Sequence, residues 1–187
     1  MRVLGISGSL RRDSHNTELL RAAATQLPPG VEFELYEGLR HIPPYDDDVR
    51  DSGGEAAAVT HLKERIAAAD AVLFATPEYN HSIPGQLKNA MDWVSRPLAD
   101  TPLKGKPVAV IGASTGMFGA VWAQAELRKV LGAIGAKVID RELPVPMADE
   151  IVRDREKLES SGTHSLIVGI LAELLEAARP AEAAAAA

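Results

Sequence analysis

Residues 71–75 read AVLFA, five apolar side chains in a row between two polar residues, Asp70 and Thr76. A strand without polar alternation is typical of a parallel sheet that helices cover on both faces. Similar short runs stand at residues 3–6 (VLGI) and 107–111 (PVAVI). The three runs therefore predict the central strands of one parallel α/β sheet.

Helical stretches separate these strands along the chain. The apolar spacing predicts helices at about 17–27, 56–69, 84–94, 120–134 and 166–178. Two more strands are predicted, at residues 31–36 and from residue 137, and residues 38–54 are predicted to be a long polar connection. Strands that alternate with helices form right-handed βαβ units. This pattern favours an α/β fold: a flavodoxin-like, doubly wound, five-stranded parallel sheet in the order 2-1-3-4-5, with helices on both faces.

The composition is that of an ordinary globular protein. Of its 187 residues 46% are hydrophobic and 25% charged, and the formal net charge is −6. We expect a single domain at residues 1–180 and a disordered Ala-rich tail at residues 181–187. The chain has no cysteine, which excludes disulfides, thiolate metal sites and thiol catalysis. Because it has neither a broad basic field nor roughly 18 consecutive apolar residues, we expect no nucleic-acid or membrane partner and a cytoplasmic location.

The loop after the first strand reads SGSLRRDSHNT at residues 7–17 and is rich in small hydrogen-bond donors. It precedes a predicted helix, whose unpaired N–H groups and dipole favour an anion. Ser9, Ser14 and Asn16 offer further donors from their side chains. Arg11 can add a charge-assisted contact. A helix cap alone would account for one of these residues, so the loop predicts a phosphate site.

The identity of the phosphate compound follows from what the loop lacks. It contains neither the dinucleotide fingerprint G-x-G-x-x-G nor the P-loop pattern G-x-x-x-x-G-K-[ST]. Glu37 stands near the place of the acid in the dinucleotide fold, but without the glycines we interpret it as a solvated charge. A hydroxyl-rich loop suits a terminal monophosphate, and FMN is the usual monophosphate ligand of this topology.

Two more loops are predicted at the same edge of the sheet. Residues 76–85 read TPEYNHSIPG, and residues 112–119 read GASTGMFG. In the first of them Tyr79 offers an aromatic face and Asn80 offers polar contacts to a flat ring. Ligands of such sheets bind beyond the carboxyl ends of the strands, at the switch point between strands 1 and 3. The three loops therefore predict one shared site.

Three motifs together resemble the NAD(P)H-dependent FMN reductases, a family that includes quinone, chromate and azo-dye reductases. They are GSLRRDSHN at residues 8–16, PEYNHSIPG at residues 77–85 and STG at residues 114–116. The resemblance implies bound FMN, NADPH or NADH as hydride donor, and ping-pong reduction of a small-molecule electron acceptor. That acceptor would be a quinone, a free flavin, an azo compound or a metal oxyanion.

The resemblance also implies the cofactor-binding residues. Those around the phosphate are Ser9, Arg11, Ser14, His15 and Asn16. Those around the flavin ring and ribityl chain are Pro77, Glu78, Tyr79, Asn80, Ser114, Thr115 and Gly116. His15 stands where the family leads us to expect an apolar or aromatic residue, so its backbone N–H is expected to serve. We expect no metal site and no catalytic side chain, because the flavin carries the hydride chemistry. Glu78 is expected to position backbone or to make a subunit contact.

A homodimer or homotetramer is implied as well, and Leu87, Met91 and Trp93 are candidates for its interface. Trp122 is expected in the core or at an interface. Residues 46–48 (DDD) lack the spacing of a calcium loop and are expected to form a solvated loop.

Two other functions fit parts of the sequence. A flavodoxin-like electron carrier would bind FMN without having a substrate of its own, but such carriers are typically more acidic and monomeric. Residues 112–116 (GASTG) also match the hydrolase nucleophile elbow G-x-S-x-G, and acids and His164 follow Ser114 in the hydrolase order. The hydrolase alternative leaves the first two loops unexplained.

Overall fold

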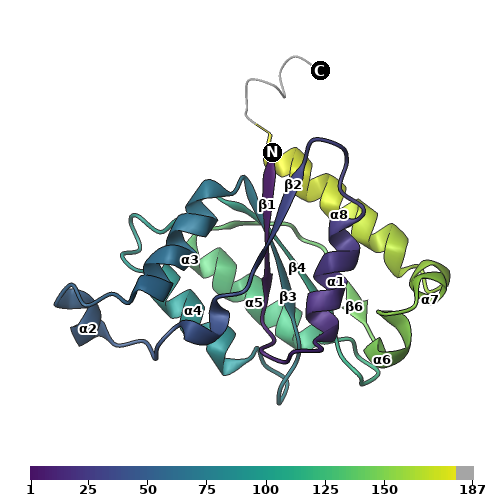
Figure 1. Cartoon of the computed structure of the whole chain (residues 1–187), viewed down its shortest axis with the longest axis horizontal. Coiled ribbons are helices and arrows are strands. Elements are labelled where there is room, and N and C mark those ends of the chain that lie inside the picture. Colours follow the sequence, from purple (N-terminus) through teal and green to yellow (C-terminus); the bar gives the residue numbers. More distant parts are fainter. Residues whose placement is uncertain (180–187) are drawn as a thin grey trace.

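The structure is a computed structural model that describes residues 1–179, and of Arg155 the backbone alone. The tail predicted at residues 181–187 lies outside the described residues. A parallel sheet in the order β2-β1-β3-β4-β5 forms the centre of the fold and confirms the predicted strand order (Figure 1).

The strands are β1 (Arg2–Ser7), β2 (Glu32–Tyr36), β3 (Ala71–Thr76), β4 (Pro107–Ala113), β5 (Lys137–Val138) and β6 (Pro144–Val145). The longer helices are α1 (His15–Ala24), α3 (Ala57–Ala68), α4 (Gly85–Val94), α5 (Val121–Ile134) and α8 (Thr163–Ala177). The short helices are η1 (Leu39–His41), α2 (Asp47–Asp51), α6 (Ala148–Ile151) and α7 (Arg155–Ser160). Each of the five predicted helices is therefore present, with ends that differ by a few residues.

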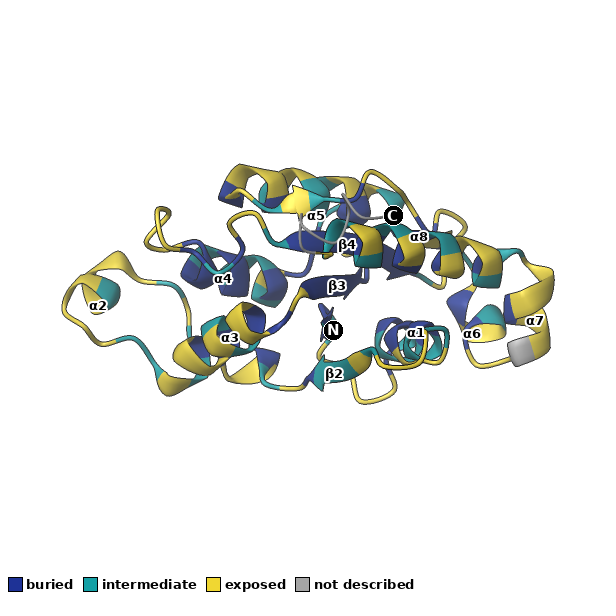
Figure 2. Cartoon of the chain, turned by 90° about the horizontal axis from the view of Figure 1, so that it is seen from above, coloured by how far each residue is buried: buried dark blue, intermediate teal, exposed yellow. Residues whose placement is uncertain are grey.

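Helices cover both faces of the sheet, as predicted. In Figure 2 helices α3, α4 and α5 lie on one side of the strands, and α1 and α8 lie on the other. Every residue of β3 and β4 is buried. Their side chains alternate between two hydrophobic clusters, with Phe74 and Val110 in one and Leu73 and Ile111 in the other. The unbroken apolar runs thus reflect a strand with helices on both faces.

The fifth strand differs from the prediction, because it is split in two. Both β5 and β6 pair with β4, at its beginning and at its end. Between them the chain carries three charged residues, and Arg141 and Glu142 pair with Glu173 and Arg128 on the neighbouring helices. These charges cannot enter the sheet without losing water, so the strand leaves β4 and returns to it.

The segment at residues 38–54, predicted as a polar connection, contains η1 and α2. Asp46 caps α2, since its carboxylate accepts hydrogen bonds from the N–H groups of Asp48 and Val49. Residues 46–48 therefore do not form the predicted loop but begin a short helix, so that prediction is wrong, although the acids stay at the surface. Acidic side chains suit this position because they face the positive end of the helix.

Helix α4 lies in the core. Leu87 and Met91 are 0% exposed and Trp93 is 1% exposed. The indole Nε1 of Trp93 donates to the carbonyl of Pro43 at 2.9 Å, so the segment before α2 covers this helix. The prediction that these three residues form a subunit interface is therefore wrong; they belong to the core. No helix among residues 1–179 is long and apolar enough to cross a membrane.

Candidate functional site

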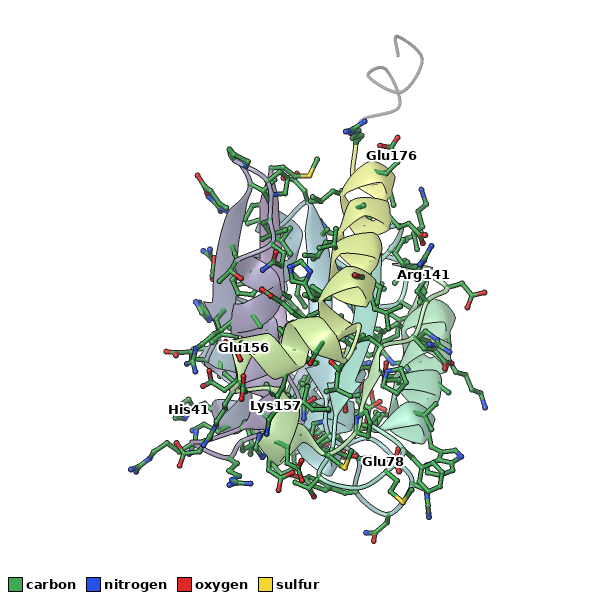
Figure 3. All side chains as sticks on the ribbon, turned by 90° about the vertical axis from the view of Figure 1, so that its right-hand side faces the viewer. His41, Glu78, Arg141, Glu156, Lys157 and Glu176 are labelled. Atoms are coloured by element: carbon green, nitrogen blue, oxygen red, sulfur yellow. The ribbon has the colours of Figure 1, made fainter. Side chains whose placement is uncertain are left out.

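The loops after β1, β3 and β4 meet at the carboxyl end of the sheet and enclose a cleft of about 150 Å³. Glu78, in the second of these loops, is labelled at this end of the molecule in Figure 3. The lining residues are Ser9, Arg11, Ser14, His15, Asn16, Pro77, Glu78, Tyr79, Ala113, Ser114 and Thr115. The structure thus brings ten of the twelve predicted site residues together, all except Asn80 and Gly116.

The β1–α1 loop presents unpaired donors to this cleft. Ser14 caps α1, because its Oγ accepts from the N–H of Thr17 at 3.2 Å, and its own hydroxyl hydrogen stays available. Within the described structure the N–H groups of His15 and Asn16 have no acceptor. Unpaired N–H groups in the first turn of a helix bind anions, and here two of them open into the same cleft.

The side chain of Asn16 holds the loop in place. Its Nδ2 donates to the carbonyl of Ala113 at 2.9 Å, and its Oδ1 accepts from the N–H of Ala113 at 2.9 Å. Both residues are buried. The side-chain amide therefore joins α1 to the end of β4, and the backbone N–H is what Asn16 offers to the cleft.

Positive charge surrounds the same loop. The guanidinium of Arg11 is exposed and has no hydrogen bond or ion pair among the described residues. Arg153, which was not predicted as a site residue, reaches the loop from the segment after α6 and donates to the carbonyl of Asp13 at 3.3 Å. No sequence pattern marks Arg153, because it lies 140 residues from its partner.

The surroundings of His15 disfavour its protonation. Burial lowers the pKa of its imidazole below 6.5, the neighbouring charges of Arg153 and Arg11 lower it further, and Asp149 and Glu18 oppose them. Its Nδ1 is buried and has no hydrogen-bond partner. An unpaired buried nitrogen is costly, and protonating this ring would add the cost of a buried charge.

We expect acid to destabilise the flavin-free protein through His15. Because the folded-state pKa lies below 6.5, the unfolded chain binds a proton more readily. The free energy of unfolding should therefore fall as the pH drops below 6.5, and it should not change through this group at higher pH. Urea unfolding at about pH 5.5 and about pH 7.5 should show a larger loss for the wild type than for His15→Phe. Equal losses would contradict this role of His15.

The loop after β3 contains a tight turn. Tyr79 and Ser82 exchange backbone hydrogen bonds of 3.0 and 3.1 Å, and Asn80 and His81 between them have φ angles of 55° and 60°. Positive φ is tolerated better by asparagine than by most residues. The turn carries Asn80 away from the cleft, which accounts for its absence from the lining.

Glu78 joins this loop to α5. Its Oε2 accepts from the N–H groups of Trp122 and Ala123 at 3.1 and 3.2 Å, so the carboxylate caps a helix whose own cap residue, Ala120, makes no side-chain bond. A second carboxylate on α5, Glu126, accepts from the N–H of Ile83 at 3.3 Å. The structure confirms that Glu78 positions backbone.

The loop after β4 is held by a buried glutamine that the sequence analysis missed. Gln124 is 0% exposed. Its Oε1 accepts from the N–H of Leu143 at 3.1 Å, and its Nε2 donates to the carbonyl of Gly119 at 3.0 Å. Ser114 is fixed on both sides, since its N–H donates to Val145 and its carbonyl accepts from Ala148. The sequence offered one sign of this role, since Gln124 is a polar residue on the apolar face of a predicted helix.

Comparison with known proteins agrees with this arrangement. The family described as NADPH-dependent FMN reductase matches residues 1–150 of the chain. The chain belongs to this family. The NAD(P)H-dependent FMN reductase PA1204 of Pseudomonas aeruginosa is 51% identical to this reductase over 131 residues, which cover 70% of this chain and 69% of the relative. The quinone reductase of Escherichia coli K12 is 41% identical over 141 residues, which cover 75% of this chain and 74% of the relative.

A solved structure supports the same assignment for the reductase. FerB, a flavoenzyme NAD(P)H:(acceptor) oxidoreductase from Paracoccus denitrificans, superposes with a TM-score of 0.76 at 35% identity. The match covers 92% of this chain and 97% of FerB. The predicted family, fold and enzyme class are therefore confirmed: the protein is an NAD(P)H-dependent FMN/quinone reductase.

Within residues 1–179, Ser114 has no hydrolase triad. The nearest partner of the Ser114 hydroxyl is the carbonyl of Gly116, at 3.5 Å. His164 lies at the start of α8, where its Nε2 is 2.8 Å from Oε1 of Gln26 on the C-terminal side of α1. The order Ser, Asp, His along the chain does not bring these groups together, so the hydrolase alternative is wrong. No group of His, Asp or Glu among the described residues is arranged to hold a metal ion.

The rim of the cleft carries exposed apolar side chains. Trp122 is 40% exposed, so it does not belong to the core. Its indole packs edge-on against the rings of His81 and Phe118, with centroids 4.7 and 4.9 Å apart. Met117 and Phe118 are even more exposed. The reductase thus exposes a group of apolar side chains beside the loops that form the cleft.

Proposed function

We propose that the reductase binds FMN in this cleft and uses it to reduce quinones and related small molecules with NADPH or NADH. When bound, FMN would supply the hydride chemistry that links the nicotinamide donor to the acceptor in a ping-pong sequence. The relatives named as quinone reductases support a quinone as acceptor. A cytoplasmic location and a homodimer or homotetramer belong to the same proposal.

One observation carries the proposal: unpaired donors of three kinds face one cleft. They are the N–H groups of His15 and Asn16, the hydroxyl of Ser14 and the guanidinium of Arg11. A monophosphate dianion needs several donors and a positive field, and the start of α1 supplies both. The residues present therefore fit the phosphate group of FMN.

Residues of the second and third loops support the flavin ring in this proposal. Pro77, Tyr79, Ser114 and Thr115 line the same cleft as the phosphate donors. Both loops are stiff, because Glu78 and Gln124 tie them to α5. Backbone amides in such fixed loops can stabilise negative charge on a bound ring without moving. These residues would orient the ring and exclude water from its edges.

No side chain here needs to transfer a proton. The carboxylate of Glu78 is only 13% exposed and is committed to the end of α5. His81 lies on the outer turn, where its side chain is 75% exposed. This arrangement supports a site whose protein groups bind and orient, while the cofactor carries the chemistry.

Arg11→Ala and Ser14→Ala should each weaken FMN binding about tenfold or more, because each removes a donor to the phosphate. Ser14→Ala should also cost about 1 kcal/mol of stability through the lost helix cap. Thr25→Ala, at the other end of α1, is the control for a lost hydroxyl near a helix end. Flavin fluorescence titrations measure the affinities, and wild-type affinity in both site variants would contradict the assignment.

The enzymatic proposal is tested by adding NADPH to the FMN-loaded protein under nitrogen. The visible flavin band should bleach without any partner protein and should return when a benzoquinone is added. A band that persists would favour the electron-carrier alternative. A protein that takes up no FMN would contradict both flavin functions.

The proposed homo-oligomer has a candidate contact surface in the exposed Phe118 and Trp122 rather than in the buried residues of α4. Apolar patches of this kind often mark protein contacts. Light scattering of the purified protein would measure the mass, and a monomer at all concentrations would contradict this part of the proposal.

A further inference from the structure

His15 brings a titratable side chain to the phosphate donors of the flavin cleft. The residue lines the cleft together with Ser14 and Arg11. Its backbone N–H has no acceptor within the described structure and is one of the donors assigned to the phosphate. The proposed function uses only this N–H and gives the imidazole no role.

The imidazole of His15 lies among charges from the β1–α1 loop, from α1 and from the segment around α6. Burial lowers the pKa of the ring below 6.5, and the guanidinium groups of Arg153, after α6, and Arg11, in the loop, lower it further. The carboxylates of Asp149 on α6 and Glu18 on α1 act in the opposite direction. In the flavin-free protein a positive ring is therefore unfavourable.

The nitrogen Nδ1 of His15 adds to this cost. It is buried and has no hydrogen-bond partner in the described part of the chain. A protonated imidazole carries a hydrogen on both nitrogens, so protonation would place an unpaired donor at Nδ1 in addition to the charge. A ring in this position gains a proton readily only when a negative charge comes close to it.

The phosphate of FMN would be such a charge. A phosphate monoester carries about −1.5 to −2 elementary charges at neutral pH. The proposed donors would hold it against the N–H of His15 and the guanidinium of Arg11, and the charge of Arg11 already acts on the imidazole. An anion bound at the same place acts on the ring with the opposite sign. Bound phosphate therefore offsets the influence of the guanidinium groups on His15.

We propose that FMN binding is coupled to the uptake of a proton by the side chain of His15, so that this residue strengthens cofactor retention as the pH falls toward about 6. This inference rests on the proposed function, because it needs the phosphate in the flavin cleft. The coupling is reciprocal: a proton on His15 tightens FMN binding by the same factor by which FMN tightens proton binding. In the FMN-loaded protein the loss of stability in acid that we expect from His15 should shrink accordingly.

Calorimetric titration of the flavin-free protein with FMN, at about pH 6 in two buffers of different ionisation enthalpy, counts the protons taken up. The wild type should take up about 0.3–0.5 proton more per FMN than His15→Phe. The phosphate of FMN itself titrates at about pH 6, and this contribution is common to both proteins. His164→Phe removes a histidine that pairs with Gln26 outside the cleft, and this control should match the wild type. Equal proton uptake by the wild type and His15→Phe would overturn the proposal.

Fluorescence titrations at about pH 7.5 and about pH 5.5 measure the same coupling as an affinity. The ratio of the wild-type affinity for FMN to that of His15→Phe should rise about threefold or more from the higher pH to the lower. Riboflavin lacks the phosphate, so the corresponding ratio for riboflavin should not change with pH. A constant ratio for FMN would refute the coupling and leave the proposed function in place. A wild-type protein that binds neither flavin at either pH would refute the proposed function as well.

NMR of the wild type tests the coupling without a substitution. The ring C–H signals of His15 should titrate with a higher midpoint in the FMN-loaded protein than in the flavin-free protein, in which burial and the two arginines lower the pKa. The same midpoint in both forms would overturn the proposal, even if His15→Phe did not fold.

Discussion

Replacing Asn16 by leucine should lower the free energy of unfolding by about 2–4 kcal/mol and should also weaken FMN binding. The leucine side chain cannot replace the two hydrogen bonds to Ala113, whose N–H and carbonyl would stay buried without partners. The start of α1 would then lose its fixed position relative to β4. Urea unfolding and FMN titration measure the two effects.

Asn89 provides a matched control. Its Oδ1 accepts from the N–H of Tyr45 at 2.7 Å, and its Nδ2 donates to the carbonyl of Pro43 at 2.8 Å, so it bridges backbone in the same way but away from the cleft. Asn89→Leu should destabilise the fold without changing FMN affinity. Equal FMN affinities in the Asn16 and Asn89 variants would contradict the positioning role of Asn16.

Gly119→Ala should destabilise the protein by about 3 kcal/mol or more. Gly119 has a φ of 56°, and an added Cβ would lie 2.5 Å from the carbonyl carbon of Pro144 and 2.5 Å from the nitrogen of Val145. Both are backbone atoms of β6, which is itself paired with β4. The strand and the loop cannot both keep their positions, so FMN binding should fall together with stability.

Gly116→Ala is the control for this change, because it lies in the same loop. A Cβ at Gly116 would meet only the Oγ of Ser114, at 3.9 Å, and its φ is not in the left-handed region. Thermal unfolding should give a nearly wild-type midpoint for Gly116→Ala and a much lower one for Gly119→Ala. Similar midpoints for the two variants would show that the contact with β6 is not important.

The sequence was sufficient to predict the strand order and the meeting of the three loops that line the candidate site. Strands such as β3 and β4 are apolar throughout because helices bury both their faces, and this pattern is visible without coordinates. The site followed from a general property of such sheets, since the loops beyond the carboxyl ends of neighbouring strands must meet.

The contacts that hold the site could not be predicted in the same way. Asn16 and Ala113 are 97 residues apart, and nothing in either local pattern points to the other. Gln124 satisfies backbone groups of two different segments, and its role depends on where the split fifth strand returns. The charged residues at the split pair with α5 and α8, and these contacts exist only after the helices have packed.

The β1–α1 loop illustrates both what the sequence could predict and what it could not. Its residue types predicted a phosphate site, yet they did not reveal that Ser14 acts as cap and donor at once, or that the Asn16 side chain faces β4. They also did not reveal the cavity of about 480 Å³ behind the loop, because Arg40 in its lining comes from a short helix that was predicted as a connection.

Fluorescence titration of the flavin-free protein with FMN and with riboflavin tests most directly whether this loop binds a flavin by its phosphate. The two ligands share the ring and the ribityl chain and differ only in the phosphate. The donors of Ser14, His15 and Asn16 and the charge of Arg11 predict that riboflavin binds at least about a hundredfold more weakly than FMN. Equal affinities for the two flavins would contradict the phosphate site and the account built on it.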